Sequence, residues 1–170
     1  MKIKIIAAVG QNNAIGGEGG KIPWSFHPED MKIFSGKTKS EGATVLMGRK
    51  TFLTLPEKFR PLPQRKNVIL TRDETWHPVG TEVFTSKEAA LEALSQENVE
   101  TFWVCGGADI YRQFIDEAEE LHISHFDVRP EKAVAFFPVI DHTLWKEVES
   151  KACPGQGEAP SFIHRVYTRK

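Results

Sequence analysis

The sequence has few cysteines, no long apolar run and almost no net charge. Its 170 residues include two cysteines, Cys105 and Cys153, which form no CxxC motif and are too few for a disulfide framework, as is typical of a reducing compartment. The apolar run near the N-terminus is only about seven residues long, too short for a signal peptide. Lys and Arg number 22 against 23 Asp and Glu, so no overall field attracts nucleic acid or an anionic membrane. We therefore expect a cytoplasmic protein that binds neither.

Signatures of several chemistries are also absent. The sequence has no G-x-S-x-G motif, no Walker motif, and no G-x-G-x-x-G that opens a helix after the first strand. His122 and His125 are three residues apart in a strand-like segment and so face opposite sides of it, and no second pair of His or Cys has the spacing of a metal site. We expect no bound metal.

Short β-branched runs alternate with segments of helical period, which indicates an α/β protein with a mostly parallel sheet. The length is that of one domain, 1–170, and there is no repeat or linker. The expected strands are 4–9, 44–47, 67–70, 82–84, 101–105 and 121–126, and the expected helices are 28–38, 49–55, 87–95 and 108–118. The last two strand-like runs, 144–152 and 161–168, flank P-G-Q-G-E-A-P and predict an antiparallel hairpin at one edge.

Glycines and basic residues gather at the expected strand ends. The stretch I-G-G-E-G-G, 15–20, is either a surface turn or a mobile lid, because ligands of α/β sheets bind beyond the carboxyl ends of the strands. Gly106 and Gly107 either turn the chain or let backbone N–H groups at a helix start approach a pyrophosphate. The basic clusters in 47–52 and 71–73 are either solvated charges or the donors for a phosphate monoester.

Asp30 stands at an unusual place in the first expected helix. Pro28 at the first helical position puts Asp30 in the first turn, where a carboxylate favours the helix dipole. At about 100° per residue it lies between Ile33 and Phe34, along the apolar edge of the helix. A carboxylate there loses hydration unless a cationic or amide-like group pairs with it. Asp30 is therefore either a helix-terminal charge or a ligand-binding acid.

These motifs together resemble dihydrofolate reductase over almost the whole chain. The likeness rests on I-A-A-V-G-Q-N-N-A-I-G, on I-P-W followed by Asp30, and on M-G-R-K-T-F, R-P-L-P-Q-R-K-N-V-I-L-T-R, V-C-G-G-A-D-I-Y and F-F-P, in this order. The resemblance implies a central, mostly parallel sheet of about eight strands flanked by about four helices, with the C-terminal hairpin at its edge. It implies reduction of 7,8-dihydrofolate to tetrahydrofolate by hydride transfer from NADPH to C6 and protonation of N5, which supports one-carbon metabolism and thymidylate and purine synthesis.

The resemblance also assigns substrate residues. Asp30 is similar to the family's acid that bonds the pterin 2-amino group and N3, Ser124 to a strand hydroxyl that shares this network, and Trp24 to an indole that holds a water. Arg65 resembles the arginine that binds the α-carboxylate of the substrate's glutamate, a task suited to its bidentate geometry. The other substrate-binding residues that the resemblance implies are Ile6, Met31, Phe34, Leu55, Arg60, Leu62 and Cys105.

The implied cofactor residues fall in three groups. Against the nicotinamide would lie Ala8, Ile15, Gly16, Gly17, Glu18, Gly19, Gly20, Lys21 and Ile22. The pyrophosphate and adjoining ribose would be held by Gly106, Gly107, Ala108, Asp109 and Ile110, with a cis peptide between the two glycines. The implied cofactor set also includes their neighbours Cys105, Tyr111 and Gln113. Near the phosphates would lie Gly48, Arg49, Lys50, Thr51, Leu70, Thr71 and Arg72. Arg49 and Arg72 would bind the 2'-phosphate, which favours NADPH over NADH.

The chain departs from the family at a few positions. Ala133, Val134 and Ala135 stand where many bacterial members have Gly-Asp-Thr, so an acid that braces the closed lid in some relatives is missing. Ser35 replaces a lysine that some relatives place near the substrate tail. The resemblance otherwise implies a monomer that binds diaminopyrimidine antifolates such as trimethoprim.

Two other functions stay open on the sequence. A riboflavin-pathway pyrimidine reductase shares this fold and NADPH, but the Pro-Trp motif followed by an acid in the first helix argues against it. A non-catalytic folate- or nucleotide-binding module is disfavoured by the joint presence of Trp24, Asp30 and Ser124.

Overall fold

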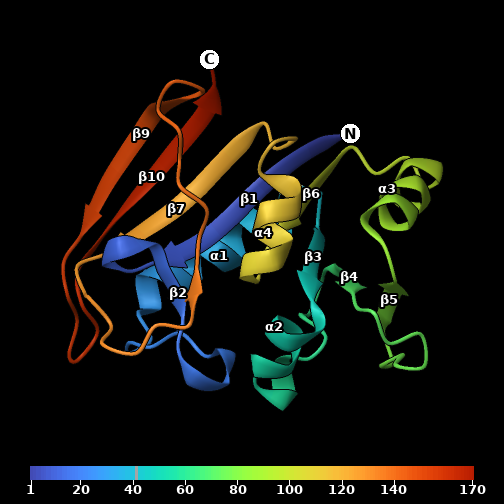
Figure 1. Ribbon diagram of the computed structural model, residues 1–170, viewed down its shortest axis with the longest axis horizontal. Coiled ribbons are helices and arrows are strands. Elements are labelled where there is room, and N and C mark those ends of the chain that lie inside the picture. The colour runs from blue at the N-terminus through green and yellow to red at the C-terminus, as the bar shows by residue number, and fades with distance from the viewer. Residues whose placement is uncertain (41) are drawn as a thin grey trace.

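The structure is a computed structural model that describes residues 1–40 and 42–170. The helices are α1 (Pro28–Ser40), α2 (Arg49–Thr54), α3 (Lys87–Gln96) and α4 (Ala108–Phe114). The strands are β1 (Lys2–Val9), β2 (Ala14–Gly16), β3 (Thr44–Gly48), β4 (Lys66–Leu70), β5 (Thr81–Phe84), β6 (Thr101–Val104), β7 (Glu120–Phe126), β8 (Ala135–Phe136), β9 (Trp145–Cys153) and β10 (Phe162–Arg169). Figure 1 shows their arrangement around one twisted sheet.

The central sheet has eight strands in the order β5-β4-β3-β6-β1-β7-β10-β9. Neighbouring strands from β5 to β7 are parallel, whereas β10 is antiparallel to both β7 and β9. In Figure 1 the two C-terminal strands lie at the end of the sheet far from β5. The predicted mostly parallel sheet of about eight strands, flanked by four helices and ending in an antiparallel hairpin, is thereby confirmed.

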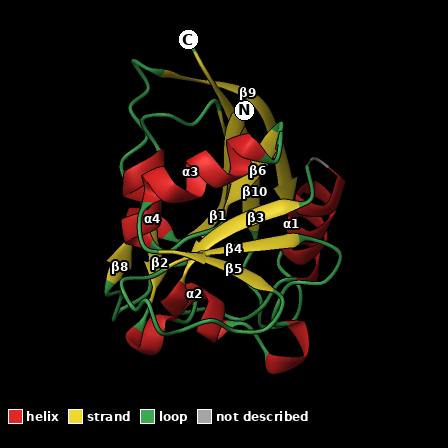
Figure 2. Ribbon diagram, turned by 90° about the vertical axis from the view of Figure 1, so that its right-hand side faces the viewer, coloured by secondary structure: helices red, strands yellow, loops and turns green. Residues whose placement is uncertain are grey.

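The helices cover the two faces of the sheet because alternate strand residues point to opposite sides. On one face, residues of α3 and α4 such as Leu94 and Phe114 pack with Ile5 and Val104 in the larger core cluster. The other face carries a second cluster that packs against α1 and α2: Ile6, Val45, Met47, Phe52, Leu62, Ile69 and Trp103, with Phe34 and Leu55 beside them. Figure 2 shows α3 and α4 on the side of the sheet opposite α1.

The predicted helix 108–118 was too long, since α4 ends at Phe114. The apolar repeat continues because Ala118, only 1% exposed, still enters the core. Its N–H donates to the carbonyl of Phe114 within a turn. The Arg169 side chain donates to the carbonyls of Ile115 and Ala118, at 2.7 and 3.0 Å. The apolar spacing up to Ala118 therefore reflects burial and not a continuing helix. Arg169, which is distant in sequence, binds the carbonyls of the turn after α4.

A second, two-stranded sheet was not predicted. The strand β2 includes the first residues of the glycine-rich stretch 15–20 and pairs with β8. The short helix Glu18–Gly20 follows it. The N–H of Val134 donates to the carbonyl of Gly16 at 2.9 Å, and the N–H of Phe137 to that of Asn13 at 2.8 Å. Within the described residues, no helix has the length and apolar character needed to cross a membrane.

Candidate active site

The predicted catalytic residues lie where α1 begins, beside the carboxyl-terminal halves of β1 and β7. Pro28 opens α1, where its missing N–H costs nothing. Before it, Nδ1 of His27 accepts a hydrogen bond from the N–H of Glu29 at 3.2 Å, while Nε2 is 2.9 Å from the carbonyl of Pro154. His27 is 3% exposed, so it both caps the helix and fixes it to the loop after β9. This residue was missed in the sequence, where a histidine before a proline gave no signal.

Asp30 in the first turn of α1 is half-buried. Burial raises the pKa of its carboxyl, and a hydrogen bond from the Ser124 hydroxyl and the nearby His27 act to lower it. Ser124 is 2% exposed and sits on β7 directly opposite Ala8 of β1. The structure therefore brings Asp30 and Ser124 together, and the first-turn acid is more than a solvated helix charge.

Apolar side chains surround this acid from two clusters. Phe34, one turn after Asp30, packs on the cluster that contains Ile6, Leu62 and Trp103, to which Leu55 and Cys105 also belong. Ile33 packs on a smaller cluster with Ala8 and Trp24, whose indole lies 5.2 Å from the Phe126 ring. Met31 is 40% exposed and lies at the outer edge. Burial raises the pKa of the Cys105 thiol to about 12, so it behaves as a neutral apolar group.

The two arginines predicted for the substrate differ in their surroundings. Arg65 lies over the Phe34 ring, 5.7 Å from its centre, and donates to the Thr38 hydroxyl at 2.8 Å. Arg60 instead contacts the Leu53 carbonyl at 3.4 Å and the carboxylate of Glu57 at 3.5 Å. Arg65 thus stands beside the apolar residues around Asp30, whereas Arg60 is held by α2 and the turn after it.

The starts of α2 and α4 lie side by side. The N–H of Gly48 donates to the carbonyl of Gly106 at 2.8 Å, and the peptide between Gly106 and Gly107 is cis, as expected. Gly106 has a φ of +115°, in the region that favours glycine. A Cβ on Gly107 would lie 3.1 Å from the Thr51 hydroxyl oxygen. Both helix starts present backbone N–H groups, so this place suits a pyrophosphate.

Several residues of the predicted cofactor set belong to the core instead of this surface. Tyr111 is 5% exposed, and its hydroxyl donates to the carbonyl of Ile6 at 2.8 Å. Burial raises the pKa of its phenol well above the ordinary value. Leu70 and Ile110 are also buried, whereas Asp109 is exposed and pairs with Arg112. These side chains shape the binding surface from beneath or flank it.

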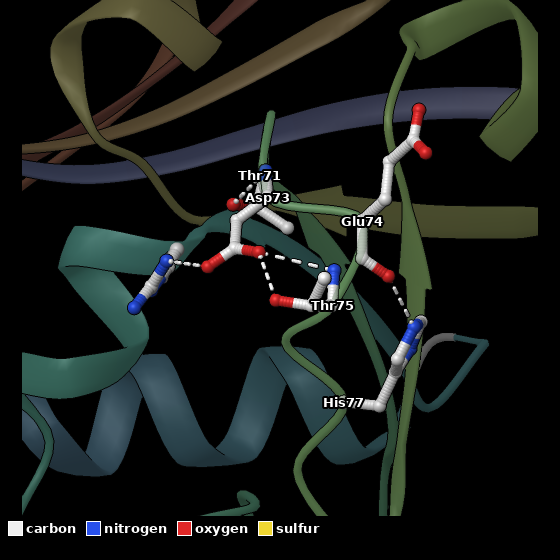
Figure 3. A network of polar contacts seen from close by, with 6 residues as sticks. Thr71, Asp73, Glu74, Thr75 and His77 are labelled. Carbon is white, nitrogen blue, oxygen red and sulfur yellow. Dashed lines mark hydrogen bonds and ion pairs between the residues drawn. The ribbon is translucent and has the colours of Figure 1, made fainter.

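The charge of Arg49, which follows β3, is partly neutralised by Asp73, which lies shortly after β4. The Arg49 guanidinium binds the Asp73 carboxylate at 2.7 Å and lies 4.9 Å from the centre of the Trp76 ring. Asp73 also accepts hydrogen bonds from the Thr75 hydroxyl and N–H, which hold its pKa below the usual range. Figure 3 shows Asp73 and Thr75 in this network. Asp73 is absent from the predicted set, although it follows Arg72 directly.

Several other predicted cofactor residues lie at the surface. Glu18, Gly19 and Gly20 of the stretch 15–20 are exposed, as are Lys21 and Ile22 after it and Lys50, Arg72 and Gln113. A Cβ on Gly20 would lie 3.6 Å from the Thr54 methyl group, so the segment reaches α2. Within the described part of the chain, no group of three His, Cys, Asp or Glu side chains is placed to hold a metal.

Comparisons with known proteins agree with this geometry. The family model for dihydrofolate reductase matches residues 2–169. Dihydrofolate reductase of Neisseria meningitidis serogroup A is 39% identical over 166 residues, covering 96% of this chain and 97% of that protein. Dihydrofolate reductase HdrB of Haloferax volcanii is 36% identical over 175 residues, covering 100% and 84%. The structure of dihydrofolate reductase from Enterococcus faecalis, complexed with NADP(H) and RAB-propyl, has a TM-score of 0.84 at 26% identity, covering 99% of this chain and 96% of that one. This chain therefore belongs to the dihydrofolate reductase family and is an NADPH-dependent oxidoreductase that reduces dihydrofolate.

Proposed function

We propose that Asp30 binds the pterin ring of dihydrofolate and that the joined starts of α2 and α4 bind NADPH. The observation that carries the proposal is the half-buried carboxyl of Asp30, bonded to Ser124 and bordered by apolar side chains. A carboxylate so placed needs a partner with N–H donors. The amino group and ring N–H of a pterin are donors of this kind.

The side chains divide the work of the reaction. Bound NADPH supplies the hydride that C6 of the pterin receives. Asp30 orients the ring by accepting its N–H donors and stabilises the positive charge that accompanies protonation at N5. Trp24 holds a water beside the acid, so Asp30 assists N5 protonation without handing over its own proton. Phe34, Leu55 and the other apolar neighbours exclude bulk water, which strengthens these electrostatic interactions.

The cofactor residues are assigned by their chemistry. Gly106 and Gly107 leave the space and the backbone N–H groups that a pyrophosphate needs, with Thr51 beside them. Arg49 and Arg72, with Lys50 and Thr71, supply cationic and hydroxyl donors for the 2'-phosphate, which favours NADPH over NADH. The segment 15–22 closes over the nicotinamide as a lid.

We further propose a cytoplasmic monomer that binds neither nucleic acid nor a membrane. Support comes from the formal net charge of -1 and from the two cysteines, which are both free.

The test is the fall of NADPH absorbance when dihydrofolate is added. We expect rapid oxidation with NADPH and slow oxidation with NADH. Asp30→Asn should lose about 10²- to 10⁴-fold in kcat/KM at neutral pH, the usual worth of a positioned acid or base. It should recover partly in acid, where solvent protonates the substrate. Glu29→Gln is the matched control, since Glu29 stands in the same turn but is exposed to solvent and pairs with Lys32 at 2.7 Å.

The outcomes separate this function from the other candidates. Equal activity of Asp30→Asn and the parent would remove Asp30 from the pterin site. No turnover by folded protein that still binds NADPH would favour the non-catalytic module. Turnover of a ribosylaminopyrimidine in place of dihydrofolate would favour the riboflavin-type substrate.

A further inference from the structure

A line of polar side chains runs beneath α1, from the far end of β7 to Asp30. Glu120, His122 and Ser124 alternate along β7 and therefore share one face. His164 of β10 is the direct antiparallel partner of Ser124. The two histidines are 1% and 4% exposed, and their ring centres are 5.6 Å apart. None of this line beyond Ser124 is used by the mechanism above.

The hydrogen bonds of this line have a defined direction. An ionised Asp30 carboxylate can only accept, so the Ser124 hydroxyl donates to it. The 3.0 Å contact between the Ser124 oxygen and Nδ1 of His164 must then be donated by the histidine. His164 is thereby assigned the Nδ1–H tautomer. Its other nitrogen, Nε2, is a buried atom for which the described residues provide no partner, and in this tautomer it is a bare lone pair, which costs less than an unpaired N–H.

A neutral His164 fits its electrostatic surroundings. Burial is the main reason that the pKa of His164 falls to about 4, and positive groups around it act in the same direction. The titratable groups on the same side are His122 of β7, Lys37 of α1 and Lys151 of β9, and His125 acts on His164 from the opposite face of the sheet. On the far side, His122 contacts the Glu120 carboxylate, which also binds Lys4 of β1 at 3.3 Å. His164 therefore stays neutral, and its donor role persists, throughout the working range above about pH 5.

We propose that His164 is a positioning residue for dihydrofolate reduction, because its Nδ1–H fixes the Ser124 hydroxyl in the orientation that serves Asp30 and the pterin. A hydroxyl has one proton and two lone pairs. The Ser124 hydroxyl donates its proton to the Asp30 carboxylate, and one of its lone pairs accepts the hydrogen bond from His164. A single lone pair therefore remains to accept a hydrogen bond from the pterin amino group. The inference rests on the proposed pterin site at Asp30 and Ser124, and it adds a determinant one layer behind the substrate.

Loss of His164 should affect the pterin and spare the cofactor. Without the Nδ1–H donor, the Ser124 hydroxyl can turn to other acceptors, and the polarised chain that stabilises the Asp30 carboxylate is broken. We expect His164→Phe to weaken dihydrofolate binding about three- to tenfold, the worth of one buried hydrogen bond. The affinity for NADPH should change by less than about twofold, because the lost hydrogen bond between His164 and Ser124 belongs to the pterin site and not to the cofactor site. The pH profile of kcat/KM should shift to higher pH, because the Asp30 carboxyl becomes harder to ionise.

The experiment is a double-mutant cycle on the full-length protein. Dissociation constants for dihydrofolate and NADPH are measured by fluorescence titration, with pH profiles of kcat/KM, for His164→Phe, Ser124→Ala and the double variant. His164→Asn is the rescue variant, since its side-chain N–H can stand where Nδ1–H stood. His125→Phe is the matched control, because His125 follows Ser124 on β7 but points to the opposite face, where it lies 3.1 Å from the Tyr167 hydroxyl.

The proposal is supported if His164→Phe weakens dihydrofolate binding, His164→Asn restores it, and the effect disappears in the Ser124→Ala background. It is overturned if His164→Phe weakens dihydrofolate and NADPH equally, or if its effect persists unchanged without the Ser124 hydroxyl. It is also overturned if Ser124→Ala weakens dihydrofolate binding while His164→Phe does not. A folded Ser124→Ala and Asp30→Asn pair that both bind dihydrofolate normally would instead refute the pterin site itself, and the role of His164 with it.

Discussion

Replacing Asp73 by Asn should strengthen the binding of NADPH but not that of NADH. Arg49 is held by Asp73 at 2.7 Å. If Arg49 binds the 2'-phosphate of the cofactor, this bond must break or be shared when NADPH arrives, and the carboxylate repels the incoming phosphate. Asparagine keeps an acceptor for Thr75 while it removes the charge. The variant therefore leaves the turn 71–75 intact and releases Arg49.

The size of the effect follows from exposure. Both side chains of the pair are 37% exposed, so the ion pair is well screened and holds Arg49 only weakly. Freed of this competition, NADPH should bind about two- to fivefold more tightly, the range expected for an exposed ion pair. The gain should shrink as salt rises, because screening weakens both the ion pair and the repulsion. The stacking of Arg49 on Trp76 keeps the guanidinium in place.

The assay is a fluorescence titration of parent and Asp73→Asn with NADPH and with NADH, at low and at moderate ionic strength. Glu74→Gln is the control, because Glu74 is an exposed acid next in the chain that contacts His77 through its backbone carbonyl and not its carboxylate. Weaker NADPH binding by Asp73→Asn would refute the reasoning. It would mean that Asp73 aims Arg49 at the phosphate instead of competing with it.

Three further results are expected. Asp30→Asn should raise the melting temperature at pH 7, because burial raises the pKa of Asp30 and its ionised form is penalised as pH rises above 3.8; calorimetry should show no gain at pH 3. The parent should lose melting temperature between pH 6.5 and about 4, since His125 and His164 have pKa values lowered to about 4 and the unfolded chain binds protons first; unchanged melting would contradict their burial as neutral groups. A diaminopyrimidine antifolate should bind through Asp30 and lose affinity in Asp30→Asn, and a fully active enzyme that such a compound fails to bind in a titration would exclude this mode.

Most of the fold followed from local patterns in the sequence. The buried parallel strands are nearly continuous apolar runs, and the hairpin of β9 and β10 follows from two strand-like runs around a Pro-Gly turn. The errors arose where distant segments decide the outcome. The helix α4 ends at Phe114, and the carbonyls of Ile115 and Ala118 just beyond it accept hydrogen bonds from the distant Arg169. The strand β2 is paired with β8, which lies more than 100 residues later in the chain. Periodicity within a window carries no information about either event.

The same distinction between local sequence patterns and contacts of distant segments applies to the residues of the candidate site. The roles proposed for Asp30, Gly106 and Gly107 start from local signals. Asp30 places an acid on the apolar edge of its own helix, and glycines before a helix have a local meaning. Asp73 was not predictable as a partner of Arg49, since an acid after a surface arginine is ordinary in any sequence.

His164 shows why such residues stay hidden. The alternation of residues within β10 predicts that His164 shares a face with Val166 and Phe162. It does not predict which residue of the neighbouring strand lies beside His164. Only the antiparallel register with β7 puts it opposite Ser124, and a slip of one residue would turn it to the other face, beside His125 and Tyr167. The chemistry assigned to His164 is therefore a property of strand pairing. A search for residues that act behind a catalytic acid should accordingly begin from the register of the strands that flank it, and a test of His164 is also a test of that register.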